Sequence, residues 1–191
     1  MRAARNAIDK KRTRELILDA TETIMREHGY AAVSSRRVAN EAGLKSQLVH
    51  YHFGTMEELF LALFQRAENR NFDRLTQAMS SSRPLHELWK ISIDRTGMGL
   101  IYEFMALANH RPALREEIAR ANVRARRMHI AMITRVLEEC QLPYPPGVVS
   151  IVLSGTALQL VSEEAIGVTE AHGEAFDYVA RLLDDIEADQ R

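Results

Sequence analysis

The sequence of 191 residues predicts an all-α protein of nine helices. Apolar residues recur at intervals of three and four along most of the chain, as on one face of an amphipathic helix. No segment has the strict alternation of apolar and polar residues that is typical of a half-buried strand. Glycine, proline and capping residues divide the chain into helical lengths. These observations favour a small front of short helices followed by a larger helical body.

Three short helices are expected first. Gly29 is placed to end the first helix, and Ser34 is a good N-cap for a second that runs to Gly43. The third is the segment 44–53, "LKSQLVHYHF". The apolar face of the first helix is formed by Leu16, Ile17, Ala20, Ile24 and Met25.

Longer helices follow. Thr55 and Glu58 form a capping box, T-x-x-E, which opens a helix to about Met79. Pro84 suits a first helical position, and this fifth helix is expected to break at "TGMG", residues 96–99. A sixth helix carries the apolar residues of 101–107, and the remaining three are expected at about 112–140, 147–171 and 173–188.

Composition excludes several classes of protein. A hydrophobic content of 46% with 27% charged residues is typical of a soluble globular chain, and no run reaches the ~18 apolar residues of a membrane span. The basic N-terminal stretch lacks the apolar core of a secretory signal, so a cytoplasmic protein without membrane partners is expected. Cys140 is the one cysteine, which excludes an intramolecular disulfide; a small core residue is the favoured interpretation and a catalytic thiol the alternative.

Charge is divided unevenly between the two parts of the chain. Residues 1–54 hold ten basic and six acidic residues, whereas residues 55–191 hold fifteen and twenty. This asymmetry indicates a small basic domain that meets a polyanion, carried on an acidic body. We therefore expect a small polyanion-binding domain at 1–54 and a larger helical body at 55–191, joined by the helix from Thr55.

The segment 44–53 has the composition of a recognition helix. Three short helices with a glycine turn between the second and third fit a helix-turn-helix, whose last helix enters the major groove. Leu44, Val49 and Phe53 would anchor its inner face. The polar residues around the rest would meet DNA: Ser46 and Gln47 at base edges, Leu48 at a thymine methyl, and Lys45, His50, Tyr51 and His52 at phosphates.

The second helix supports this interpretation. Arg36 and Arg37 lie in its first turn, where the helix dipole disfavours cations unless an anion such as a DNA phosphate is near. The basic run at 10–14 would trail along a groove, or else form a solvated charged segment. His50 and His52 point about 200° apart on a helix, so they cannot share a metal ion, and no metal site is expected.

With these residues in view, the segment from about Arg14 to Phe64 resembles the N-terminal domain of the TetR family of bacterial transcriptional repressors. The shared landmarks are Ile17, Ala20, Gly29-Tyr30, Val38-Ala39, Ala42-Gly43, Tyr51, Phe53, Glu57 and Leu59. The resemblance implies a homodimer on a palindromic operator, released when a small molecule binds the C-terminal domain. It thus implies a DNA-binding domain at 1–54 and an effector-binding and dimerisation domain at 55–191. It also implies base contacts for Arg36 and 46–48, and phosphate contacts for Tyr51 and His52.

The segment departs from the family pattern at three positions. Lys45 stands where a Ser or Thr N-cap is usual, so Ser46 is expected to cap instead. Met56 replaces a lysine, which removes one phosphate contact. His50 replaces a tyrosine, which leaves its contact open.

Large apolar residues in the middle helices are candidates for an effector pocket, with core packing as the alternative. They are Phe64, Trp89, Tyr102, Phe104, Met105, Met128 and Met132. Arg120, Arg124 and Arg127 form a row that would face an acidic ligand or, more simply, solvent with Glu116 and Glu117.

The last two helices carry apolar stripes suited to a four-helix dimer interface. The candidate interface residues are Val152, Thr156, Leu160, Phe176, Val179 and Leu183.

The chain is therefore expected to be a ligand-responsive DNA-binding regulator, without cofactor. It contains no GxSxG, P-loop or HExxH motif, so catalysis is not expected. A helical ligand-binding or adaptor protein without sequence-specific DNA binding is the alternative.

Overall fold

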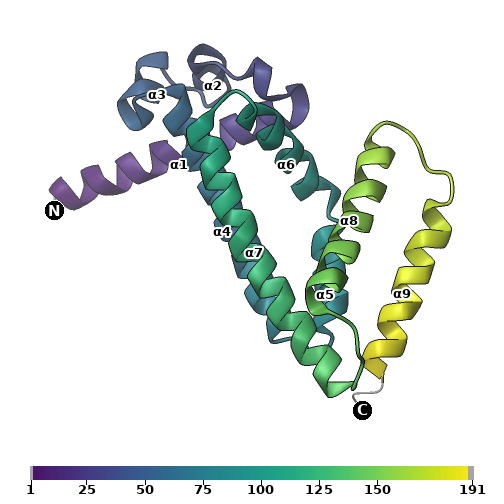
Figure 1. Cartoon of the computed structure of the whole chain (residues 1–191). Coiled ribbons are helices and arrows are strands. Elements are labelled where there is room, and N and C mark those ends of the chain that lie inside the picture. The colour runs from purple at the N-terminus through teal and green to yellow at the C-terminus, as the bar shows by residue number, and fades with distance from the viewer. Residues whose placement is uncertain (1, 189–191) are drawn as a thin grey trace. The chain divides into compact units, whose positions relative to one another are not determined.

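The computed structural model describes residues 2–188, with side chains over 8–187, and this part of the chain contains nine α-helices, one 3₁₀ turn and no strand (Figure 1). The predicted all-α class is confirmed. The helices are α1 (Arg2–His28), α2 (Ser35–Glu41), α3 (Ser46–Phe53), α4 (Met56–Met79), α5 (Pro84–Ser92), α6 (Arg95–Ala108), α7 (Pro112–Glu139), α8 (Pro146–Ala165) and α9 (His172–Ala188), with the 3₁₀ turn η1 at Tyr30–Ala32.

The chain folds into two compact units. Unit 1 contains the residues up to 68 together with 99–119, and unit 2 contains 69–98 together with the chain from 120 onward. The helices α4 and α7 each contribute residues to both units. The functional division at residue 54, which separates DNA binding from effector binding, remains a prediction.

In unit 1, α1 packs against η1 and α2, and α2 packs against α3. Ile17, Met25 and Val38 are completely buried, and Phe64 meets Phe104 edge to face with ring centroids 5.2 Å apart. Burial of such side chains is the main favourable contribution to folding. These helices therefore form one core that holds α3.

An ion-pair cluster fastens α4 to α1 within the same unit. Nη1 of Arg66 lies 2.6 Å from Asp19 and 3.3 Å from Glu15, while Nη2 lies 2.8 Å from Glu22. The three acids lie at intervals of four and three on α1, so they share one face. One guanidinium therefore joins two helices over two turns of α1.

In unit 2, α5 packs against α8 and α9 around a second core. That core includes Leu75, Leu85, Leu88, Trp89, Met132, Ile133, Val136, Ala157, Leu160 and Leu183. The ring centroids of Trp89 and Phe176 lie 6.2 Å apart, which brings α9 against α5.

Local signals predicted several helix ends correctly. Gly29 follows α1 with φ of +78°, Ser34 caps α2 by accepting from Arg37 N, and Pro84 begins α5. The Thr55–Glu58 capping box is formed, since Glu58 N donates to Thr55 Oγ1 and Thr55 N donates to Glu58 Oε2.

Three predicted boundaries are wrong. The first helix already begins at Arg2, so the basic run at 10–14 is helical and not a trailing arm. The break after α5 lies at Ile93–Asp94, and residues 96–99 form the start of α6, because the Asp94 carboxylate accepts from Thr96 N at 3.1 Å. The eighth helix ends at Ala165 and not near 171.

A Schellman motif explains the early end of α8. Gly167 has φ of +84°, and its N–H donates to Glu164 O at 3.0 Å. The next N–H, that of Val168, donates to Glu163 O at 2.9 Å. These two bonds satisfy the last carbonyls of the helix and turn the chain away.

The helix α8 is also long and apolar enough, by length and composition alone, to cross a membrane, and 28% of its apolar window is buried. Core and interface helices of soluble proteins meet the same two criteria. The helix is therefore weak evidence for a membrane span.

Candidate nucleic-acid interface

The turn between α2 and α3 is a second Schellman motif. Gly43 has φ of +67°, its N–H donates to Asn40 O at 3.1 Å, and Leu44 N donates to Ala39 O at 2.8 Å. A left-handed residue at this place is most easily a glycine, since a Cβ would be strained. The motif sets the angle at which α3 leaves α2, as a helix-turn-helix requires.

The helix α3 is anchored by its inner face and open on its outer face. Val49 and Phe53 are buried, as predicted, and Leu44 is half-buried. Ser46, Gln47 and His50 are exposed. The predicted division of this segment into an anchoring side and a polar side therefore agrees with the residues' burial.

The start of α3 differs from the expectation. Lys45 is its N-cap, without a side-chain capping bond, and Ser46 is the first helical residue. Ser46 therefore does not cap the helix. The N–H groups in the first turn of α3 therefore receive no hydrogen bond from the side chain of the N-cap residue. Free N–H groups at a helix N-terminus attract anions such as phosphates.

Tyr51 and His52 occupy different environments. Tyr51 is 70% exposed, a high value for an aromatic side chain, whereas His52 is half-buried. Burial, followed by the charges of Lys10 and Arg14, lowers the pKa of His52 below its ordinary value. His52 is thus more readily neutral than a free histidine, and Tyr51 is the more accessible hydrogen-bond donor.

His50 has a defined hydrogen-bond role within the protein. Its Nδ1 lies 3.1 Å from Gly54 O, and a carbonyl only accepts, so Nδ1 carries the proton. In the neutral ring Nε2 is then an acceptor. His50 can therefore act as the predicted phosphate donor only in its doubly protonated, cationic form.

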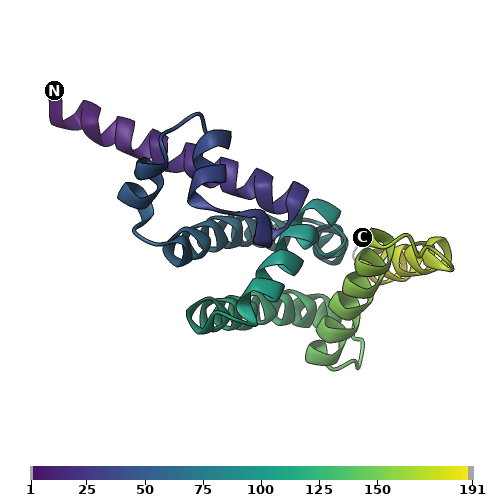
Figure 2. The ribbon, with the colours of Figure 1, turned by 90° about the horizontal axis from the view of Figure 1, so that it is seen from above.

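The basic part of α1 contacts α3 directly. Nζ of Lys10 lies 5.5 Å from the centre of the Tyr51 ring, and the guanidinium of Arg14 lies 4.2 Å from that of Phe53. Such cation–π contacts place positive charge beside the recognition helix. In Figures 1 and 2 the N-terminal part of α1 projects beyond α2 and α3.

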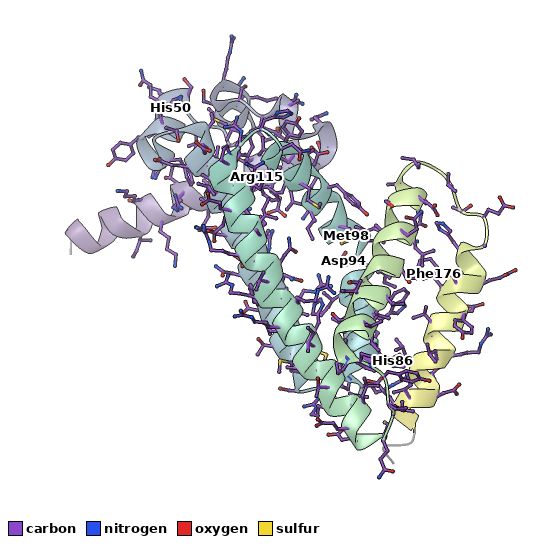
Figure 3. All side chains as sticks on the ribbon, viewed as in Figure 1. His50, His86, Asp94, Met98, Arg115 and Phe176 are labelled. Atoms are coloured by element: carbon purple, nitrogen blue, oxygen red, sulfur yellow. The ribbon has the colours of Figure 1, made fainter. Side chains whose placement is uncertain are left out.

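On α2, Arg36 and Arg37 are both exposed in the first turn of the helix. Exposed residues of α2 and α3 therefore offer one cationic and hydrogen-bonding surface, which we call the α2–α3 surface: Arg36, Arg37, Lys45, Ser46, Gln47, His50 and Tyr51. Figure 3 labels His50 in this group of helices. Such a surface can contact phosphates and base edges of a DNA groove.

A contact from α6 supports the turn that precedes α2. Oε2 of Glu103 accepts from Tyr30 N at 2.6 Å, and a Cβ at Gly29 would lie 3.4 Å from the same carboxylate oxygen. Gly29 and Tyr30 were recognised from sequence as landmarks, whereas Glu103 was not. Its partner is 73 residues away, a separation that no local pattern reveals.

The residues predicted for an effector pocket are distributed over the two units. Phe64, Tyr102 and Met105 belong to unit 1, where Phe64 is buried and Met105 is half exposed at 50%. Trp89, Met128 and Met132 belong to unit 2, where Trp89 and Met132 lie in the core and Met128 packs against it. A pocket role for these six residues, and for Phe104, which is buried in unit 1, stays a prediction.

The arginine row of α7 faces outward. Arg120, Arg124 and Arg127 are all exposed, and the guanidinium of Arg124 lies 4.7 Å from the centre of the Phe72 ring. Within the described residues, no group of three or more histidine, cysteine or acidic side chains is arranged to hold a metal ion.

The residues predicted for a dimer interface divide into two sets. Val152 is 60% exposed and Thr156 is half-buried, but Leu160 and Leu183 lie in the core of unit 2, with Phe176 and Val179 packed against it. A dimer-interface role for these six residues stays a prediction. The large apolar residues of α8 and α9 that are exposed in the protomer are Val148, Ile151, Val152, Leu158, Tyr178 and Leu182.

Comparison with known proteins agrees with this geometry. The sequence model of the family described as "Bacterial regulatory proteins, tetR family" matches residues 17–63. The HTH-type transcriptional regulator PksA of Bacillus subtilis (strain 168) is 26% identical over an alignment of 113 positions that covers 54% of this chain. The match spans about half of that relative as well, 55% of its length.

Solved structures have a similar fold over most of the chain. A TetR transcription regulator from Haloarcula marismortui is 21% identical with a TM-score of 0.73, covering 92% of this chain and 98% of its own. A transcriptional regulator from Saccharomonospora viridis in complex with choline is 19% identical with a TM-score of 0.78, covering 92% and 95%. The multidrug binding protein EbrR complexed with imidazole is 28% identical with a TM-score of 0.57, covering 79% and 80%.

Proposed function

Because this chain belongs to the TetR family of bacterial transcriptional regulators, we propose that it is a repressor that binds a palindromic operator as a homodimer and is released by a small molecule. DNA binding and transcriptional regulation are properties of the family. The repressor role, the operator symmetry, the homodimer and the effector are our inference for this chain. Its place of action would be the cytoplasm, where the DNA lies, and no catalytic role is proposed.

One observation carries the proposal, namely the α2–α3 surface. It combines Arg36, Arg37 and Lys45, which suit phosphates, with Gln47, which can pair with adenine. All four side chains are exposed, although the helices that carry them are buried on their inner faces. An adaptor that binds a protein partner would not require this combination on a recognition helix.

The proposed homodimer would place two copies of α3 in successive major grooves. The half-sites of such an operator lie about 34 Å apart, one turn of the double helix. Relatives solved with choline or imidazole support a small-molecule effector, although they do not indicate which one acts here.

The test is fluorescence anisotropy of labelled DNA from upstream of the encoding gene, compared with scrambled DNA over a series of salt concentrations. Binding to one segment that survives competitor DNA is expected. Weak binding that declines equally for both sequences as salt rises would reflect phosphate attraction alone and would contradict the proposal for that segment.

Gln47→Ala makes this test specific to the recognition helix. It is expected to weaken binding to the operator by about 1–3 kcal/mol and to leave nonspecific binding unchanged. Gln77→Ala, at an exposed glutamine of α4, is the matched control and should bind as the parent chain does. Equal operator affinity for both variants would remove Gln47 from the reading role.

A further inference from the structure

Arg126 joins α7 to α8 inside unit 2. Its Nη1 donates to Ser150 Oγ at 2.9 Å and to Ser154 Oγ at 3.0 Å. Ser150 is only 1% exposed, while Arg126 and Ser154 are half-buried. The hydroxyl of Ser154 donates to Ser150 O at 2.7 Å, so its oxygen is free to accept from the guanidinium. The guanidinium is thus held in a fixed position between two helices.

The charge of Arg126 is not neutralised by the protein. Some other arginines of unit 2 have acidic partners: Arg74 pairs with Asp94 and Arg95 with Glu164. Among the described residues no carboxylate lies within ion-pair distance of Arg126, whose hydrogen-bond partners are the two hydroxyls. The bonds from Nη1 leave Nε–H and the two Nη2–H groups as donors without an acceptor among the described residues. A half-buried cation without a counter-charge is costly, and an anionic ligand would offset that cost.

A second titratable side chain lies near Arg126. His129 lies one turn along the same helix, and burial, followed by the charge of Arg126, lowers its pKa to about 4. At neutral pH its ring is therefore uncharged and offers one donor and one acceptor. On α8, Val149 and Leu153, each the residue before one of the two serines, pack against the core of unit 2. Apolar walls with a few fixed polar groups are typical of ligand sites.

The guanidinium lies on the inner side of α8. Ser150 and Ser154 share a helical face with Ala157 and Val161, which are buried. The most exposed apolar residues of this helix, such as Ile151, lie away from that face. A carboxylate from a second copy docked on the exposed side of α8 is therefore a poorer candidate for the counter-charge than a small molecule.

We propose that Arg126, Ser150, Ser154 and His129 bind the carboxylate of an organic acid with an apolar body. The remaining N–H groups of Arg126 would take the carboxylate oxygens, and the apolar side chains of α7 and α8 would contact the body of the ligand. The regulatory meaning of this site rests on the proposed function, because ligand binding would then control DNA release.

The test compares three probes of equal chain length: octanoate, octan-1-ol and octylamine. Binding is measured by isothermal titration calorimetry of the full chain without DNA. Octanoate is expected to bind at least about tenfold tighter than either other probe, because a charge-assisted hydrogen bond contributes a difference of this size. Arg126→Gln should abolish this preference for the acid and leave octanol binding unchanged. Arg127→Gln, at the exposed neighbouring arginine, should retain the preference.

Arg126→Lys is the second variant, which tests the same site if Arg126→Gln does not fold. A lysine keeps the positive charge but not the forked donors, so octanoate binding should fall between that of the parent chain and that of Arg126→Gln. Octanoate that binds no better than octanol would overturn the proposal. A preference for octanoate that persists in a folded Arg126→Gln variant would do the same.

Operator binding, measured separately in the absence of any probe, distinguishes this inference from the proposed function. If the parent chain shows no specific DNA binding, the proposed function is overturned. Selective octanoate binding that depends on Arg126 would still support the site. Release of operator DNA by octanoate from the parent chain, but not from Arg126→Gln, would support both together.

Discussion

At the scale of the residue, Gly43 and Gly99 differ in conformation although both have open space around them. Gly43 ends α2 with φ of +67°, whereas Gly99 lies inside α6, and a Cβ at either position meets nothing within 4 Å. Any effect of an added methyl group therefore arises from the backbone. The left-handed conformation disfavours alanine, and a helix interior favours it.

We expect Gly43→Ala to lower the free energy of unfolding by about 1–2 kcal/mol and Gly99→Ala to raise it by about 0.5–1 kcal/mol. Urea denaturation at one protein concentration measures both. An alanine at 43 that leaves stability unchanged would show that the turn adopts another conformation in solution.

His129 makes stability depend on pH. Its pKa is lowered from the ordinary 6.5 to about 4 in the folded protein, by burial and by the charge of Arg126. As pH falls below 6.5 the unfolded chain takes up the proton first, so this contribution is complete above 6.5 and is lost as pH falls toward 4.

The contribution from His129 should be about 2 kcal/mol smaller at pH 5 than at pH 7. In His129→Gln the loss of stability between these two pH values should shrink by that amount, as followed by denaturant unfolding. His110→Gln, at an exposed histidine, is the control and should keep the full loss. Identical pH dependence in both variants would contradict the burial of a neutral ring.

At the scale of the element, α5 receives its cap from the other end of the chain. Arg83 makes no side-chain capping bond at the start of this helix. Glu187 of α9, only 4% exposed, accepts instead from Leu85 N at 2.6 Å and lies 2.5 Å from His86 Nδ1. Arg83 also pairs with Asp184. Figure 3 shows His86 beside the C-terminal part of α9.

Glu187→Ala should therefore lower the free energy of unfolding by about 1–3 kcal/mol, because a buried N–H at the start of α5 loses its acceptor. Glu174→Ala removes an exposed glutamate of the same helix and should change stability by no more than about 0.5 kcal/mol. Equal effects would mean that α5 is capped in another way.

At the scale of the whole molecule, α8 and α9 present apolar side chains that the protomer leaves uncovered. Ile151 and Val152 are each 60% exposed, and Tyr178 is 63% exposed. Side chains of this kind gathered on a protein surface usually mark an interface. The proposed homodimer would cover them with the same surface of a second copy.

Light scattering at micromolar concentration should give about twice the 21.7 kDa mass of one chain. Ile151→Glu with Val152→Glu should give the mass of one chain and weaken operator binding, since a single α3 would then meet a single half-site. Gln77→Glu with Ala131→Glu, at two exposed positions, adds the same charge and is the control; it should keep the mass of the parent chain. A monomeric parent chain would contradict the dimer.

Much of the candidate nucleic-acid interface could be predicted from local sequence. Val49 and Phe53 are buried and Gln47 is exposed because helical spacing decides which residues share a face. The same reasoning selected Arg120, Arg124 and Arg127 on α7 and missed Arg126, although an arginine on the apolar face of a helix is itself a signal. Helical spacing did not separate Leu160, in the core, from Val152, at the surface.

The sequence by itself determined the all-α class, most helix ends and the helix-turn-helix. Their causes lie within about five residues of one another, as in the Ser34 cap and the Thr55–Glu58 capping box. Only the tertiary structure decided that Glu187 caps α5, that Glu103 holds Tyr30 and that Arg126 meets two serine hydroxyls. A helical pattern states which face of a helix is buried, but the partner of that face depends on how distant helices pack.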